Sequence, residues 1–325
     1  MKPFRKYQSL FAPMMCTLAM ICGCDQQEVQ LTDVTDRPAV SPVIHDSDSI
    51  GGSEREFSLR ELLKESIQQA NVVVPNPDDL NRFSGLIEET IRSTDPLSLR
   101  DRWRESGWLL HEDPDSNIVV IAEHPDARHG RGIYAFRLRS DSQLILQAPH
   151  RFYDRRTGTI VRKMFLENDV HAAAWNTVHR EQVDVAHESR HYLAAFTEAM
   201  MRVDDELAVI QLHGFANKSR SANARNAKVI VSNSTRFPGR LARDVAISLK
   251  EEFGVEQVLL FPLEVSELGG TTNAQASIVR GTGNPNFLHL EINSELRQQI
   301  EESASIRGAF FGALEGRSEF ETANR

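Results

Sequence analysis

Short apolar runs separated by polar segments dominate the chain from about residue 100 onward. The runs read "NIVVIAE", "GIYAFRL", "QLILQAP", "LAVIQLHG", "AKVIVSN", "VLLFPLE" and "NFLHLEI". Several are continuously apolar rather than alternating, which is typical of strands that are buried on both faces of a sheet. Each run therefore predicts a strand.

Helical patterns separate many of these strands. One is "HYLAAFTEAMMRV", and another is "PGRLARDVAISLKEEFG", which has Pro238 inside its start and Gly254 just past its end. Strands that alternate with helices predict an α/β domain. We expect this domain over residues 101–325, with a mostly parallel or mixed central sheet and helices on both faces.

Two helices are predicted ahead of that domain. Ser58 and Glu61 have the spacing of a capping box, and apolar residues recur at helical spacing after Pro77, at Leu80, Phe83, Ile87 and Ile91. Residues 57–100 are therefore interpreted as a helical extension that precedes the α/β domain.

The first 23 residues have the pattern of a secretory signal. Basic residues precede an apolar run that is too short to span a bilayer, and the run ends in "ICGC". This ending resembles the lipobox of bacterial lipoproteins. The resemblance implies cleavage before Cys24, lipidation of Cys24 and, because Asp25 follows, retention at the periplasmic face of the inner membrane.

Amino-acid composition adds expectations about the tether, the cysteines and nucleic-acid binding. Residues 24–56 are rich in Asp, Ser, Pro and Gln and predict a disordered tether. All three cysteines, Cys16, Cys22 and Cys24, lie at or before the start of that tether, so the mature domain is expected to have neither a disulfide nor a cysteine nucleophile. A net charge of −9 argues against a general nucleic-acid binder.

Residues that suit a metal site come near the ends of three predicted strands. His150 follows "LILQAP" and Asp154 comes four residues later, His213 precedes Gly214, and Glu291 lies in "NFLHLEI". Ligands of open α/β sheets bind beyond the carboxyl ends of strands. Two imidazoles and a carboxylate suit zinc with an open position, and a further carboxylate can act as base. The alternative is two hydrogen-bonded histidines at strand ends.

Three segments resemble motifs of a known superfamily. "QAPHRFYDRRTGTI" looks like the first metal motif of phage-type poly-γ-glutamate hydrolases, a branch of the zinc carboxypeptidase-like superfamily, and "QLHG" looks like the second. "FLHLEINSELR" is similar to the end of N-formylglutamate amidohydrolases. The resemblance implies that His150, Asp154 and His213 bind zinc and that Glu291 is the general base. The bulky residues before Asp154, where the family has glycines, leave the substrate open.

Basic and amide side chains near these motifs are candidates for substrate binding. Arg155 flanks the first motif together with Arg151 and Arg156, Arg236 follows a predicted strand, and "ELGGTTNAQASIVRGTG" contains Asn273 and Arg280. An arginine can pair with a carboxylate through two hydrogen bonds. We therefore expect a small-molecule or peptide substrate that bears a carboxylate, with contacts from Arg155, Arg236, Asn273 and Arg280.

A second zinc motif competes with this interpretation. "AHESRHYLAAF" contains H-E-x-x-H, with His187, Glu188 and His191, which on a helix would hold zinc beside a catalytic glutamate. However, Arg190 lies inside the motif, where a cation opposes the charge of the metal.

The sequence thus predicts a lipid-anchored, extracytoplasmic zinc hydrolase of an amide bond. The bond that it would cleave is a γ-glutamyl, peptide or N-acyl amino acid bond. A non-catalytic lipoprotein module with the same fold is the alternative from another functional class, and an H-E-x-x-H protease is the less favoured enzyme.

Overall fold

The computed structural model describes residues 58–66, 72–113 and 116–316. The signal, Cys24 and the tether lie outside these residues. Glu54–Arg325 form one compact unit. No helix in the described ranges is both long enough and apolar enough to cross a membrane.

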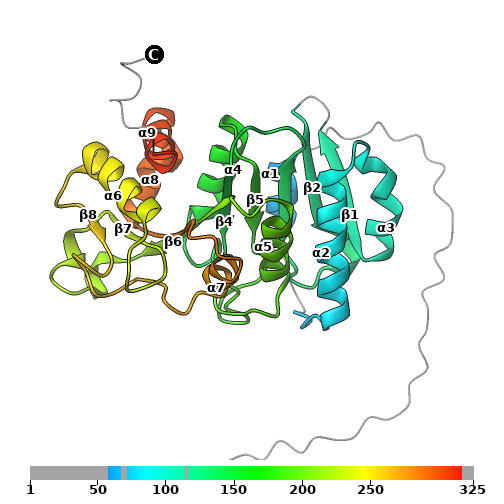
Figure 1. Cartoon of the computed structure of the whole chain (residues 1–325), viewed down its shortest axis with the longest axis horizontal. Coiled ribbons are helices and arrows are strands. Elements are labelled where there is room, and N and C mark those ends of the chain that lie inside the picture. Colours follow the sequence, from blue (N-terminus) through cyan, green and yellow to red (C-terminus); the bar gives the residue numbers. More distant parts are fainter. Residues whose placement is uncertain (1–57, 67–71, 114–115, 317–325) are drawn as a thin grey trace, which may run out of the picture. The chain divides into compact units, whose positions relative to one another are not determined.

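A mixed sheet forms the centre of the unit, as predicted (Figure 1). Within the described residues it has nine strands in the order β1-β2-β3-β5-β4-β6-β9-β7-β8. β4 pairs in parallel with β5 and β6, β6 with β9, and β7 with β8, whereas the remaining neighbours are antiparallel. The strands are β1 (Trp108–Asp113), β2 (Ile118–Glu123), β3 (Ile133–Arg137), β4 (Leu144–Ala148), β5 (Ala172–Trp175), β6 (Ala208–Phe215), β7 (Val229–Ser232), β8 (Val258–Leu260) and β9 (Phe287–Asn293).

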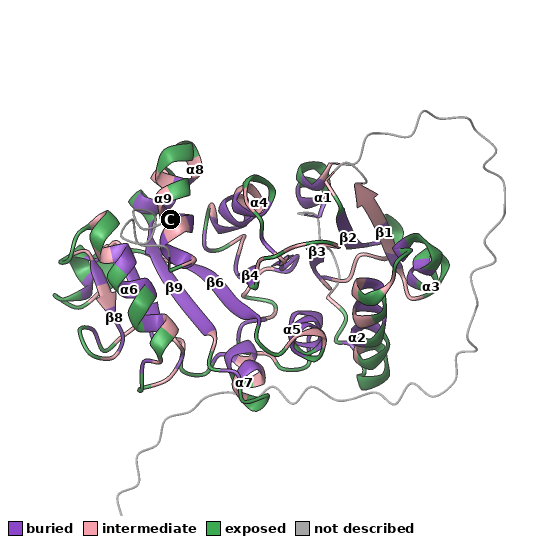
Figure 2. Ribbon diagram, turned by 45° about the horizontal axis from the view of Figure 1, so that its top comes forward, coloured by how far each residue is buried: buried purple, intermediate pink, exposed green. Residues whose placement is uncertain are grey.

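Helices cover both faces of the sheet. One apolar core joins the sheet to α1 (Leu59–Glu65), α4 (Thr157–Glu167), α6 (Arg240–Phe253), α8 (Ser294–Glu302) and α9 (Ala304–Leu314). A second core lies on the other face, under α2 (Pro77–Arg92), α3 (Arg100–Glu105), α5 (Tyr192–Val203) and α7 (Ala274–Gly281). The central strands β6 and β9 are buried along most of their length, while the outer sides of the helices are exposed (Figure 2).

The predicted helix signals are present at the helix ends. Ser58 caps α1 by accepting a hydrogen bond from the Glu61 amide, and Asn76 caps α2 immediately before Pro77. Gly254 ends α6 at a φ of 100°, a conformation that favours glycine because it has no Cβ.

The predicted helical extension packs against both faces of the sheet, with α1 in the first core and α2 in the second. The ring of Phe83 on α2 lies 4.9 Å from Trp108, 5.1 Å from Tyr134 and 5.1 Å from Tyr192, measured between centroids. These rings come from α2, β1, β3 and the start of α5. Residues 57–100 therefore have no core of their own within the described structure.

Candidate metal centre

The parallel strands β4, β6 and β9 bring the predicted site residues to one edge of the sheet. His150 comes two residues after β4, and His213 lies opposite Glu291 in the β6–β9 register. Side chains alternate between the faces of a strand, so residues two apart share a face. Gln211 and His213 on β6 therefore project on the same side as His289 and Glu291 on β9.

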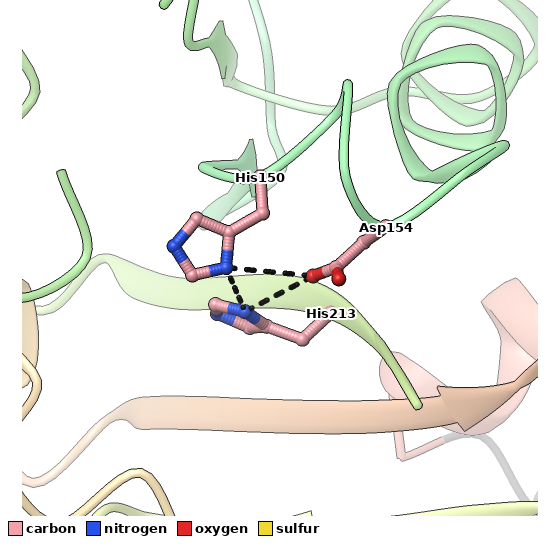
Figure 3. A group of neighbouring side chains, drawn as sticks. All are labelled: His150, Asp154 and His213. Carbon is pink, nitrogen blue, oxygen red and sulfur yellow. Dashed lines mark hydrogen bonds and ion pairs between the residues drawn. The ribbon is translucent and has the colours of Figure 1, made fainter. Parts of the chain in front are cut away.

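His150, Asp154 and His213 converge on one point (Figure 3). The two Nδ1 atoms are 3.2 Å apart, and each lies 3.5 Å from Oδ2 of Asp154. Tetrahedral zinc with ligands at about 2.1 Å requires a separation of roughly 3.4 Å between donor atoms. The three donors thus fit three corners of a zinc tetrahedron, and a fourth corner remains for water or substrate. All three side chains are buried.

A carboxylate orients the ring of His150. Nε2 of His150 lies 2.7 Å from Oδ1 of Asp184, and the other oxygen of Asp184 accepts a hydrogen bond from Arg180. With Nε2–H donated to Asp184, the Nδ1 lone pair faces Asp154 and His213. This carboxylate–histidine arrangement typically supports a zinc ligand. Asp184 belongs to none of the sequence motifs and comes from a segment without regular secondary structure.

An amide network orients the ring of His213 in the same way. Nε2 of His213 lies 3.1 Å from Oε1 of Gln211, whose amide nitrogen donates to Gln147 and Gln275. These donations fix which end of the Gln211 amide faces the histidine. His213 therefore also directs its Nδ1 lone pair toward the convergence point.

Electrostatics favour the ionisation states that a metal requires. Burial and the nearby His289 hold the pKa of His213 well below its usual value, so its ring is neutral. Although burial opposes the shift, the nearby rings of His150 and His213 lower the pKa of Asp154, which is therefore ionised. Burial would lower the pKa of His150, but Asp154 and Asp184 raise it. Neutral imidazole and carboxylate are the ligating forms, so zinc binding would displace any proton from His150.

A second group lies against the first. His213, His289 and Glu291 also bring ligand atoms close together, and Nε2 of His289 lies 3.2 Å from Oε1 of Glu291. The His289 ring packs against the His213 ring at a centroid distance of 4.1 Å. Oε2 of Glu291 has no hydrogen-bond partner among the described residues. Because both His213 nitrogens already face other groups, the first set is the stronger candidate for a metal site.

Glu291 and the histidines border a cavity of about 390 Å³. Arg236 and His187 lie on its exposed side, and Gly270 lies beside His289. Gly270 has a φ of 58°, and a Cβ there would come within 2.8 Å of the His289 ring. This position therefore requires glycine for both its backbone conformation and its packing.

A buried arginine lies beneath the site. Arg297 on α8 packs its guanidinium against Gly214, where a Cβ would come within 1.9 Å of it, and donates to the carbonyl of Ile292. Burial lowers the pKa of Arg297, while the charges of Asp154 and Glu291 oppose that shift. Arg297 thus adds positive charge close to two carboxylates of the site.

Of the predicted substrate contacts, the structure places Arg236 alone at the cavity. Arg155 is exposed and does not line it, because the turn that buries Asp154 leaves Arg155 facing solvent. Arg280 lies in the last turn of α7, whose eight residues extend about 12 Å, so it lies away from the site that the helix start approaches. Asn273 is buried; it caps α7 and donates to Gln211. The structure therefore does not place these three side chains in the lining of this cavity.

The H-E-x-x-H segment does not form a zinc site of the helical kind. Its residues precede α5, which begins at Tyr192. His191 caps that helix by accepting from the Leu193 amide, and its Nε2 lies 3.1 Å from the Gly130 carbonyl. His187 instead lies beside Thr272. The helical geometry that the zinc protease interpretation requires is absent.

No protein-family model matches the chain, and no curated protein matches its sequence. Solved structures give distant likenesses. A bacteriophage poly-γ-glutamate hydrolase is 12% identical, with a TM-score of 0.37 over 57% of this chain and 88% of its own. An N-formylglutamate amidohydrolase from Ralstonia eutropha is 12% identical, with a TM-score of 0.38 over 55% and 92%. An aspartoacylase family protein from Mesorhizobium loti is 12% identical, with a TM-score of 0.38 over 64% of this chain and 71% of its own.

The first two of these structures represent the two families that the sequence motifs resemble. At such TM-scores they are not evidence about the activity of this chain. A function for this chain therefore has to be inferred from its own side chains.

Proposed function

We propose that the protein is a zinc-dependent hydrolase of an amide bond. The observation that carries the proposal is the convergence of His150, Asp154 and His213 at the spacing of zinc ligands, with a hydrogen-bond acceptor behind each histidine. A zinc ion held by these residues would supply Lewis acidity, which polarises a carbonyl group and acidifies water.

Glu291 is the proposed general base. Its Oε1 is held by His289, while Oε2 is buried without a hydrogen-bond partner among the described residues and so retains its capacity to accept a proton. Glu291 would take the proton of the attacking water and return it to the departing amine. Glu291 lies opposite His213 on the neighbouring strand, which keeps the base beside the proposed metal ligands.

The substrate is proposed to be a small molecule or peptide that bears a carboxylate. Arg236 lies on the exposed side of the cavity and forms no salt bridge or hydrogen bond with the described residues. An unpaired guanidinium at a cavity mouth suits a carboxylate, which it can bind with two parallel hydrogen bonds. The cavity volume of about 390 Å³ is in the range of small-ligand sites. γ-Glutamyl, peptide and N-acyl amino acid bonds all fit this description.

We further propose that the protein works outside the cytoplasm, attached to the membrane through lipidated Cys24. The support is the "ICGC" segment after a short apolar run and the confinement of all three cysteines to the first 24 residues. The periplasmic face of the inner membrane is the favoured location because Asp25 follows the cysteine.

Replacement of the proposed base tests the activity. Zinc-loaded protein is assayed for amine release from N-acyl amino acids and γ-glutamyl dipeptides. Glu291→Gln should lower turnover by about 10²–10⁴-fold, because a general base contributes that much, while zinc content stays unchanged. Glu295→Gln, the same change on the first turn of α8, serves as a control and should retain activity. Zinc binding without turnover of any substrate in the wild type would favour a binding module instead.

A further inference from the structure

A second cavity, of about 600 Å³, lies between α1, α4 and α8. No residue that lines it also lines the cavity beside His213. The segment between β4 and α4 borders both: His150 and Asp154 face the proposed metal centre, whereas Arg151, Phe152 and Arg156 line the second cavity. The two sites are therefore adjacent but distinct.

Positive charge dominates the lining of this second cavity. Six of its lining residues are basic and one, Glu301, is acidic, although the whole chain carries a net charge of −9. The basic residues are Arg60, Lys64, Arg151, Arg156, Arg162 and Lys163. The sign of this cluster is opposite to the net charge of the chain. The basic side chains repel one another unless an anion binds between them.

Most of these cations lack a carboxylate partner. Glu301 pairs with Arg156 and Glu61 with Lys64, and Lys163 donates to the backbone carbonyl of Glu301. Arg60 and Arg162 form no salt bridge or hydrogen bond with the described residues. Burial lowers the pKa of Arg162, the nearby Arg60 adds to that shift, and Glu167 and Glu301 do not offset it. The charge of Arg60 thus acts on Arg162, and the nearby carboxylates do not cancel it.

Arg151 is held rigidly at the wall of the cavity. Its guanidinium donates to the Leu63 carbonyl and the Ser66 hydroxyl, while its Nε has no partner among the described residues. Burial without a carboxylate partner lowers the pKa of Arg151 to about 9. Its Cβ packs against Gly158, where an added Cβ would come within 2.9 Å. Glycine at the first turn of α4 thus makes room for this arginine.

The start of α4 adds to the positive potential. Gly158 and Thr159 line the cavity, no side chain caps the helix, and its first turn contains no acid. The N-terminus of an 11-residue helix carries partial positive charge and attracts anions. Arg156, which precedes the helix, adopts a φ of 78°, a conformation that L side chains rarely adopt.

We propose that this cavity binds a phosphate-bearing anion. Several guanidiniums suit a group with multiple charges and several acceptor oxygens better than they suit a single carboxylate. The phosphate can belong to a soluble compound or to the headgroup of a membrane lipid. In both cases the guanidiniums would bind the same phosphate oxygens, and the experiments below distinguish the two carriers of the phosphate.

Calorimetric titration of the full-length chain with inorganic pyrophosphate tests the proposal. Wild-type protein should bind, and the affinity should fall as salt rises. Arg162→Glu should weaken binding by about tenfold or more, since it reverses a charge in the cluster. Lys64→Glu should do the same, and its side chain is 74% exposed, so the fold should not depend on it. Arg240→Glu, on α6 with a side chain that is 95% exposed, is the matched control and should bind like wild type.

A second arm uses vesicles of phosphatidylglycerol and of phosphatidylcholine. Charge-dependent binding to phosphatidylglycerol vesicles that both variants weaken would identify a lipid headgroup as the source of the phosphate. Pyrophosphate binding without such vesicle binding would identify a soluble source. Failure to bind either probe, or binding that persists in both variants, would overturn the proposal.

Discussion

At the residue scale, the proposed metal centre depends on the nitrogen of each histidine that does not face the metal. Asp184 accepts from His150, and Gln211 accepts from His213, which leaves both Nδ1 atoms free to ligate. Although burial opposes the shift, the hydrogen bond from His150 and the charge of Arg180 lower the pKa of Asp184 to about 2, so it stays ionised at neutral pH. A fixed tautomer and a fixed ring orientation are what distinguish a ligand pair from two histidines that only share a hydrogen bond.

Loss of the Asp184 carboxylate should therefore weaken zinc binding. Asp184→Ala removes the acceptor of His150 Nε2–H, and outer partners of this kind are typically worth about 10–100-fold in metal affinity. Competition with a fluorescent zinc chelator measures the change. Asp126→Ala, which removes the carboxylate from an exposed histidine–aspartate pair with His124, is the control. Equal zinc affinity in wild type and Asp184→Ala would show that Asp184 does not support the site.

The sequence identifies some of these residues and not others, for physical reasons. His150, His213 and Glu291 could be predicted because parallel strands place their carboxyl ends at one edge of the sheet. Gln211 and His289 were missed, although each stands two residues before a predicted site residue on the same strand, and the two-residue period is the signal that would have found them. Asp184 offers no such signal because no regular element positions it.

At the scale of elements, continuous apolar runs revealed most of the strands. β1 and β5 were missed: β5 is the short segment "AAAW", without a β-branched residue, and β1 is a half-buried edge strand that ends in polar residues. The H-E-x-x-H spacing suggested that the helix extends back to His187, but the side chain of His191 caps α5 and the helix begins after it. A capping histidine is uncommon, so the spacing of the motif alone was misleading.

The capping role of His191 gives a pH-dependent contribution to stability. Burial lowers the pKa of His191 to about 4, despite its hydrogen bond to the Gly130 carbonyl. The unfolded chain takes up this proton near pH 6.5 and the folded chain only near pH 4. The contribution of His191 to the free energy of unfolding is therefore fully present above about pH 6.5. It is lost as pH falls toward 4, by about 3 kcal/mol at most.

His191→Asn should flatten this dependence. Asparagine can still cap the helix but cannot titrate. Urea unfolding between pH 5 and 8 should show a smaller loss of the free energy of unfolding at low pH than in wild type. His124→Asn, at an exposed histidine, should keep the slope of wild type. If His191→Asn and wild type lose stability equally between pH 6.5 and 5, His191 is not the source.

At the scale of the whole molecule, the sequence predicted an α/β unit but not the direction of every strand. β7 runs antiparallel to β9 although both are short apolar runs next to helices, and nothing in their residues encodes that choice. The sequence likewise predicted a helical extension but not its position, because only tertiary packing brings Phe83 against the rings of Trp108 and Tyr192. Long-range contacts of this kind are not visible in local patterns.

The proposed lipid anchor predicts where the full-length protein is found. Cys24→Ser removes the thiol that would carry the lipid, so the protein should move from the membrane fraction to the soluble fraction after cell breakage. Cys16→Ser, the same substitution earlier in the apolar run, should leave the protein with the membranes. Membrane retention of Cys24→Ser would contradict lipidation at that residue.

Zinc content tests the central claim most directly. Purified wild-type protein should contain about one zinc ion per chain, since three protein donors converge on one point. His213→Ala should lose that zinc, whereas His187→Ala, at the other histidine motif, should keep it. Wild-type protein without zinc, or zinc that is lost from His187→Ala and kept by His213→Ala, would contradict the assignment of His150, Asp154 and His213 as the metal centre.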